Sequence, residues 1–294
     1  MRVGVLYGGR SNEAEISRRS GRAVLNALKT ARVDSRGIEV TERLPADLLK
    51  NKIDFCFIAL HGKYGEDGTV QGLCEMMGIP YSGSGVLASA LSMNKALTKS
   101  FLSAHGIATA PFQVLSDLNQ NLAMTLPCVI KPVDGGSAIG ITIVRKASQI
   151  KPAIKLALKH SRQALAEKFI SGQEVTAPVL GDQVLPLVEI IPKSVFYDFK
   201  AKYDSGGSQH ILPARLAART ASLIRKWAMD AHTLLGCRAF SRSDFIVDKQ
   251  GRPFFLEINS IPGMTETSLY PEAAKAAGYS LTETILKIIQ LSQV

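Results

Sequence analysis

The sequence has little cysteine and no long apolar run. Its four cysteines, Cys56, Cys74, Cys128 and Cys237, lie far apart in apolar surroundings and form no C-x-x-C pair. This spacing argues against zinc sites and redox pairs, so we expect buried free thiols. No run approaches the roughly 20 apolar residues that a membrane span needs. The N-terminal apolar run, residues 3–7, is too short for a signal peptide. We therefore expect a cytoplasmic protein without a membrane segment.

Basic runs are also missing, although the chain is basic overall. Lys and Arg number 35 and Asp and Glu 25, which gives a net charge of +10 over 294 residues. These charges are dispersed, without an aromatic-interleaved patch, and this disfavours a nucleic-acid partner. Attraction of anionic small substrates is another use for such a charge. The length predicts about two domains, with room for three small ones.

Two familiar catalytic or nucleotide motifs are absent, and a third is only mimicked. Neither Ser137 nor Ser208 has G-x-S-x-G flanks, so the chain has no nucleophile elbow. No G-x-x-x-x-G-K-[ST] segment exists, which excludes a P-loop. Residues 83–88 mimic a dinucleotide fingerprint. However, the run before them, residues 79–81, is short and contains proline, and no acid follows about 20 residues on.

The first third of the chain has the pattern of a parallel α/β domain. The buried-strand run at residues 3–7 ends at Gly8-Gly9, and a helix follows, in which Asn12 and Glu15 have capping-box spacing. A second strand, residues 55–60, ends at His61. Ligands bind beyond the carboxyl ends of such strands, so both ends are predicted ligand-binding positions.

Residues 242–269 have the strongest local pattern. Two apolar runs flank a polar turn that ends in Gly251, which predicts a hairpin. Asp244 begins its first strand, and Glu257 and Asn259 end its second, pointing the same way. Oxygen ligands that converge in this way suit Mg²⁺. The simpler alternative is that acids end strands because turns are polar.

A glycine-rich loop forms a second candidate site. Lys131 ends the strand run at residues 128–132, the loop covers residues 133–140, and another strand is expected at residues 141–144. Such a loop covers phosphates in one class of ATP-binding proteins, and the alternative is a flexible hairpin. We also expect a helix over residues 222–235, stopped by Gly236, and a short one over residues 271–277.

Together these segments resemble the D-alanine–D-alanine ligases of the ATP-grasp superfamily. The resemblance is carried by residues 242–244, 256–259, 262–265, 8–13 and 61–68, and it extends over nearly the whole chain. It implies an α/β ATP-grasp fold of three α/β domains, the first with a parallel sheet. The implied boundaries are 1–94 for the N-terminal substrate domain, 95–180 for the central ATP-binding domain and 181–294 for the C-terminal catalytic domain.

The resemblance also implies roles for individual residues. The implied catalytic residues are Glu13, Ser137, Tyr203, Arg242, Gly263 and Ser268. The implied contacts to D-alanine are His61, Lys202, Ser268 and Leu269. The implied ATP contacts are Lys95, Lys131, Glu167, Lys168, Phe169, Ile170, Glu174 and Phe196. The implied metal ligands are Asp244, Glu257 and Asn259, for two Mg²⁺ ions that Mn²⁺ can replace. The implied assembly is a homodimer, without nucleic acid or membrane.

The implied reaction joins two D-alanines through an acyl phosphate made from ATP. Related ligases that make D-alanyl-D-lactate tend to carry His where this chain has Tyr203, so the resemblance implies a dipeptide product. It also implies a link from Tyr203 through Ser137 to Glu13. For Glu167, Lys168, Ile170 and Glu174, any one residue taken alone fits the solvent-facing side of a strand better than a contact to ATP.

Four positions depart from the family pattern, and two other functions remain open. The departures are Asn94 in place of Asp, Gly135 in place of Glu, Ala138 in place of Ser and Lys200 in place of an acid. The second hypothesis is an ATP-grasp ligase for other carboxylate and amine substrates. The third is a non-catalytic nucleotide-binding regulator, which three of the departures (Asn94, Gly135 and Ala138) suggest.

Overall fold

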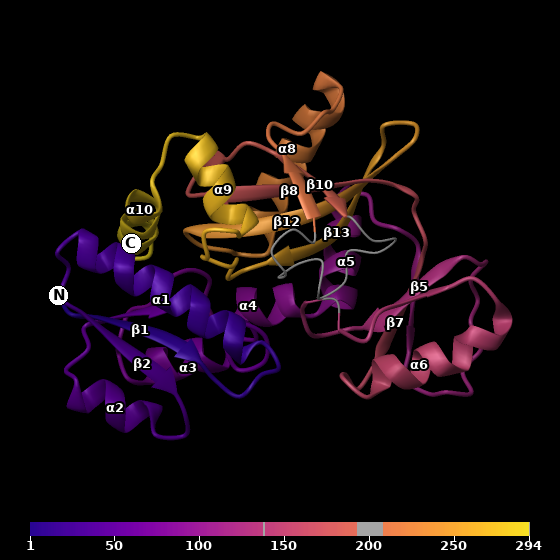
Figure 1. The fold of residues 1–294 in the computed structure, drawn as a ribbon. Helices are drawn as coiled ribbons and strands as arrows, with labels where there is room; N and C mark the ends of the chain where they lie inside the picture. The colour runs from indigo at the N-terminus through magenta and orange to yellow at the C-terminus, as the bar shows by residue number, and fades with distance from the viewer. Residues whose placement is uncertain (138, 193–207, 294) are drawn as a thin grey trace.

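The computed structural model describes residues 1–137, 139–192 and 208–293 (Figure 1). The described residues form three sheets, and each brings a different part of the site into place. The first sheet lies near the N-terminus, the second lies at the opposite end of the molecule with α6, and the third lies above and between them. Among the described residues, no helix combines the length and the apolar character needed to cross a membrane.

The N-terminal sheet is parallel, as predicted, with the strand order β2-β1-β3. The strands of this sheet, the helices between them and the three helices that follow are β1 (Val3–Gly8), α1 (Ala14–Thr30), β2 (Ser35–Val40), α2 (Leu44–Lys50), β3 (Phe55–Ile58), α3 (Thr69–Met76), α4 (Val86–Met93) and α5 (Lys95–Ala104). α1 packs closely on the sheet, because a Cβ at Gly21 would lie 2.5 Å from Cβ of Tyr7. Near the start of α1, Ser17 Oγ accepts a hydrogen bond from the Gly8 N–H (2.8 Å) and donates one to the Ala59 carbonyl (2.7 Å), so the start of the helix lies at the carboxyl ends of β1 and β3.

The capping box predicted for Asn12 and Glu15 is wrong. α1 begins at Ala14, with Glu13 at its N-cap position. The turn before it is closed by Ser11, whose Oγ accepts a hydrogen bond from the Glu13 N–H (3.1 Å) and donates one to the His61 carbonyl (2.7 Å). The turn therefore joins the ends of the first and third strands, a contact between distant residues that the local spacing could not reveal.

The second sheet is antiparallel, with the order β4-β7-β5-β6 and α6 on one face. Its elements are β4 (Phe112–Leu115), β5 (Cys128–Pro132), β6 (Thr142–Val144), the 3₁₀ helix η1 (Ala147–Gln149), α6 (Ile150–Leu158) and β7 (Ala164–Lys168). β5 and β6 flank the glycine-rich loop, as predicted, and apolar residues of both strands pack with α6 in a small core. The loop is thus held at one end of a rigid sheet.

The third sheet has the order β11-β10-β8-β12-β13, and β9 pairs with β8. Its elements, and the helices around it, are β8 (Gly172–Leu180), β9 (Gln183–Val184), β10 (Val188–Pro192), β11 (Ser208–Ile211), α8 (Ala218–Leu234), β12 (Phe240–Asp248), β13 (Pro253–Asn259), α9 (Leu269–Ala276) and α10 (Leu281–Leu291). The hairpin of β12 and β13 is confirmed, and its register shifts between Asp244 and Phe245. β8 pairs with β10 and β12, although the sequence placed residues 172–180 in the central domain. The boundaries after residues 94 and 180 stay predictions.

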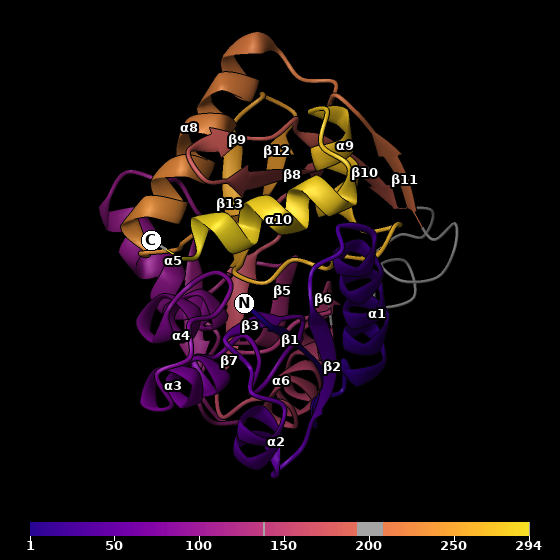
Figure 2. The same cartoon turned by 90° about the vertical axis from the view of Figure 1, so that its left-hand side faces the viewer.

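The C-terminal helices connect the third sheet with the N-terminal part. α10 lies beside α1, between the first and third sheets (Figure 2). Its Ile285, Ile288 and Ile289 share one buried core with residues of β1 and β3. The predicted helix 222–235 begins earlier, at Ala218, and ends before Gly236 as expected. All four cysteines are buried free thiols, as predicted.

Candidate active site

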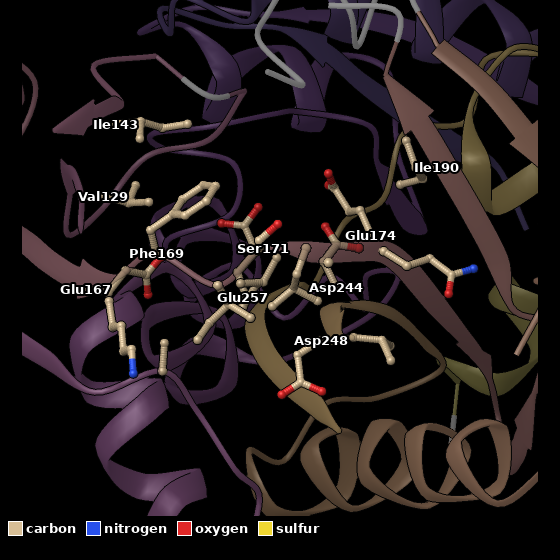
Figure 3. A pocket seen from close by; sticks show the side chains of 18 of the residues that line it. Val129, Ile143, Glu167, Phe169, Ser171, Glu174, Ile190, Asp244, Asp248 and Glu257 are labelled. Atoms are coloured by element: carbon tan, nitrogen blue, oxygen red, sulfur yellow. The ribbon is translucent and has the colours of Figure 1, made fainter. Parts of the chain in front are cut away.

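A cavity of about 1050 Å³ lies between the second and third sheets (Figure 3). Its apolar lining residues come from both sheets and their connections, and are Val129, Ile141, Ile143, Phe169, Ile246 and Leu256. Its charged lining residues include Lys131, Glu167, Lys168, Glu174, Asp244 and Glu257. A cavity of this size, with both apolar and charged lining residues, has room for a nucleotide. Six of the eight predicted ATP contacts line it: Lys131, Glu167, Lys168, Phe169, Ile170 and Glu174.

Three buried charges meet at the inner wall of this cavity. The Glu167 carboxylate lies 2.5 Å from Lys131 Nζ and 3.0 Å from Lys99 Nζ. Burial alone raises the pKa of Glu167, but the two ammonium groups outweigh it and bring that pKa to about 2. Glu167 is therefore ionised at neutral pH. Lys99 was missed by the sequence reasoning, because a lysine within an amphipathic helix is usually exposed.

Lys95 begins α5 and does not line the cavity itself, but it contacts Glu257, which does. Its Nζ donates a hydrogen bond to the Gly135 carbonyl (2.5 Å) and lies 3.4 Å from Glu257 Oε2. The helix start is capped by Asn94, whose Oδ1 accepts a hydrogen bond from the Leu97 N–H (3.0 Å). Asn and Asp cap helices about equally well, so the departure at residue 94 keeps the local function of the side chain.

The three predicted metal ligands lie on the paired strands β12 and β13. Asp244 is directly opposite Glu257, and Arg242 is opposite Asn259. Thr176 Oγ1 donates to Asp244 Oδ1 (2.5 Å), and the Arg242 guanidinium contacts both oxygens of Asp244 (3.0 and 2.8 Å). Asn259 Oδ1 accepts from the Ile261 N–H (2.9 Å).

This donor set fits a hard cation. Nowhere in the described ranges do three or more His, Cys, Asp or Glu side chains form a metal-binding group. Two adjacent carboxylates and an amide oxygen nevertheless suit Mg²⁺, which usually takes one or two carboxylates and completes its shell with water and phosphate. The protein's own cations, Lys95 and Arg242, balance these carboxylates in the structure.

A buried contact between a hydroxyl and a carboxylate marks the side of the site nearest the N-terminal sheet. Ser137, in the glycine-rich loop, donates a hydrogen bond to Glu13 at the start of α1. Both side chains are buried. Gly136 lets the loop approach this closely, because a Cβ there would lie 3.1 Å from Glu13 Oε1. The structure thus brings Glu13 and Ser137 together as predicted.

Glu66 is a second buried acid here, to which the sequence reasoning gave no role. Its Oε2 accepts a hydrogen bond from the Gly62 N–H (2.5 Å). Burial, together with the neighbouring charge of Glu13, raises the pKa of Glu66 to about 8. Two close buried carboxyls disfavour double ionisation, so Glu66 carries a proton at neutral pH. The only sequence feature that could have pointed to Glu66 was the segment Gly65-Glu66-Asp67-Gly68, and this segment does not reveal that the Glu66 side chain is buried.

His61 is buried beside these acids. One ring nitrogen, Nε2, lies 3.0 Å from Ser20 Oγ on α1. Burial lowers the pKa of His61 to about 4, and Arg242 lowers it as well. The ring is therefore neutral at pH 7, when one nitrogen can donate and the other accept a hydrogen bond.

The loop after β13 closes the same region. A Cβ at Gly263 would lie 2.9 Å from Ser268 Oγ, so only glycine fits there without displacing that hydroxyl. Ser268 Oγ lies 2.7 Å from Thr265 Oγ1 and accepts a hydrogen bond from the Thr265 N–H (3.2 Å). The Leu269 side chain packs into the core, so any substrate contact of this residue would come from its backbone. Phe196, Lys202 and Tyr203, with the departures Ala138 and Lys200, lie outside the described residues.

The fold and the cavity define an ATP-grasp ligase. Residues 34–84 match the family model described as D-ala D-ala ligase N-terminus, and residues 101–290 match the model described as D-ala D-ala ligase C-terminus. A D-alanine–D-alanine ligase of Pelotomaculum thermopropionicum is 47% identical over 99% of this chain and 96% of that protein.

Two solved structures extend the comparison. The D-alanine–D-alanine ligase of Bacillus anthracis in complex with ATP superposes with a TM-score of 0.86 at 31% identity, over 100% of this chain and 97% of that one. The VanG D-Ala:D-Ser ligase of Enterococcus faecalis has a TM-score of 0.85 at 31% identity, over 99% of each chain. The chain belongs to the D-alanine–D-alanine ligase family.

Proposed function

We propose that this ligase joins two D-alanines in the site formed by Glu13, Ser137, Arg242 and the charged end of the cavity. A carboxylate oxygen of the first D-alanine attacks the γ-phosphorus of ATP, and ADP leaves. The amine of the second D-alanine then attacks the acyl carbon, loses a proton and expels phosphate. The product is D-alanyl-D-alanine, a precursor for peptidoglycan.

The observation that carries this assignment is the contact between Ser137 and Glu13. It joins the loop beside the nucleotide cavity to the first helix, so the acid lies at the phosphate end of the site. Glu13 is positioned to pair with the ammonium group of the first D-alanine. Glu66 stays protonated, so it adds no second negative charge there.

The nucleotide occupies the cavity with its base among the apolar lining residues. Glu167, Lys168 and Ile170 contact the base, Glu174 accepts hydrogen bonds from the ribose hydroxyls, and Lys131 offsets phosphate charge; all five residues line the cavity. Lys95 lies beside Glu257, where the phosphates extend. Two lysines near the triphosphate offset its charge and draw it into a site with low dielectric.

Asp244, Glu257 and Asn259 would hold the Mg²⁺ ions, two in number, which Mn²⁺ could replace. Bound metal would offset the negative charge that develops during phosphoryl transfer. Arg242 is held against Asp244 in the described structure, and its guanidinium is placed to stabilise negative charge on the acyl oxygen together with the Gly263 N–H.

Phosphate release across a panel of D- and L-amino acids tests the assignment. We expect ADP and phosphate with D-alanine and not with L-alanine. The match to a D-Ala:D-Ser ligase makes D-serine the most informative second acceptor. Turnover with other carboxylate and amine pairs, and not with D-alanine, would favour the second hypothesis. A complete lack of turnover would favour the regulator. The homodimer and the cytoplasmic location stay predictions.

A further inference from the structure

Lys99 is a fully buried lysine in α5 that none of the assigned roles uses. Its side chain has 0% exposure. Its Nζ donates a hydrogen bond to the Phe255 carbonyl on β13 (2.9 Å) and lies 3.0 Å from Glu167 Oε2. A buried ammonium group loses its hydration and is retained only where charged and polar partners replace the water.

Glu167 lies between Lys99 and a lysine of the cavity wall. Its other oxygen, Oε1, is 2.5 Å from Lys131 Nζ. Lys131 and Glu167 line the cavity, whereas Lys99 lies behind them. With all three groups charged the cluster carries +1, and this charge faces the place where an anionic nucleotide binds.

α5 connects this cluster with the phosphate end. Lys95 and Lys99 are four residues apart, so they lie on one face of the helix about one turn apart. Lys95 reaches Glu257, and Lys99 reaches the carbonyl of Phe255, two residues earlier on the same strand. One helix therefore sets both the base end and the phosphate end of the cavity against β13.

We propose that Lys99 is a positioning residue for ATP, acting through Glu167 on Lys131. Lys99 balances the Glu167 charge, so Lys131 keeps its positive charge available to the nucleotide. Without Lys99, the buried carboxylate has Lys131 as its one remaining lysine among the described contacts, and the cluster becomes neutral. This inference rests on the proposed placement of the nucleotide in this cavity.

The first test is nucleotide affinity of the full-length enzyme, measured by calorimetry with ADP and with a non-hydrolysable ATP analogue. We expect Lys99→Met to raise the Kd for both nucleotides by about tenfold, the size of effect that losing one charge-assisted interaction has. The change in kcat should be smaller. Lys99→Arg retains the charge and is expected to stay within about threefold of the parent.

Thr98→Val is the matched control on the same helix. Thr98 is buried and donates to the Leu91 carbonyl (2.5 Å), away from Glu167. We expect this change to lower Tm and to leave the nucleotide Kd unchanged. If Lys99→Met likewise lowered Tm without weakening nucleotide binding, the role would be structural only and the inference would be overturned.

A double-mutant cycle with Glu167→Gln tests the route of action. Lys99→Met/Glu167→Gln removes the Glu167 charge together with its Lys99 partner. We therefore expect it to fold even if Lys99→Met, which leaves the carboxylate without that partner, does not. Compared with Glu167→Gln alone, we expect it to change the Kd less than about twofold, because there is no carboxylate left to balance. An equal tenfold loss in both backgrounds would show that Lys99 acts independently and would refute the proposal.

Lys131→Met distinguishes failure of the inference from failure of the nucleotide placement. If Lys131→Met and Glu167→Gln both bind ADP like the parent, the cavity is not the nucleotide site, and the Lys99 inference fails with it. If Lys131→Met weakens binding and Lys99→Met does not, the placement stands and the Lys99 inference alone is wrong.

Discussion

The proton on Glu66 makes a pH-dependent prediction about stability. The pKa of Glu66 rises from an ordinary 4.5 to about 8 in the folded protein, mainly through burial. The folded state therefore binds more protons than the unfolded state between these two values. Its stability contribution is complete below about pH 4.5 and is lost as the pH rises through 8. At 1.36 kcal/mol per pKa unit, the full loss has an upper bound of about 5 kcal/mol.

Glu66→Gln isolates this contribution, because Gln resembles the protonated acid and still accepts the Gly62 hydrogen bond. We expect the free energy of unfolding, measured by urea denaturation of the ligand-free enzyme from pH 5 to 9, to fall more steeply for the parent than for Glu66→Gln. The variant should become the more stable protein at the alkaline end. Glu15→Gln is the control, because Glu15 is an exposed carboxylate on α1 with 69% side-chain exposure. Parallel pH curves for the parent and Glu66→Gln would refute a buried proton on Glu66.

Three further predictions follow from the site. Glu257→Gln should abolish most ADP release with D-alanine while Tm changes by only a few degrees, because the charge that anchors Mg²⁺ is lost and the shape is kept; parental turnover would remove the metal assignment. Asn94→Ala should cost about 1 kcal/mol in urea unfolding and Asn94→Asp close to nothing, since only the former loses the α5 cap; equal losses would contradict a capping role. In competition at pH 7, D-alanine should exclude D-lactate as acceptor, because Tyr203 brings no positive charge to repel an ammonium group; substantial depsipeptide would contradict this specificity.

Local patterns in the sequence predicted the elements that hold the site. The apolar runs around the turn at Gly251 predicted the hairpin, and β12 and β13 confirm it. The runs on either side of the glycine-rich loop predicted two strands, and β5 and β6 confirm them. Such features depend on neighbouring residues, because side-chain alternation and turn chemistry act over a few positions.

The charge states of the site were decided by the tertiary structure. Glu66 holds a proton, and Lys99 is fully buried behind Glu167, because residues distant in the chain remove water from these groups and supply their partners. The start of α1 follows the same rule: Ser11 closes the turn by donating to the His61 carbonyl, fifty positions away, and so displaces the local Asn12 cap. The sequence determined where strands, turns and ligand-bearing residues occur. Only the packing of the three sheets determined which side chains are buried together, and burial sets the strength of their electrostatic interactions.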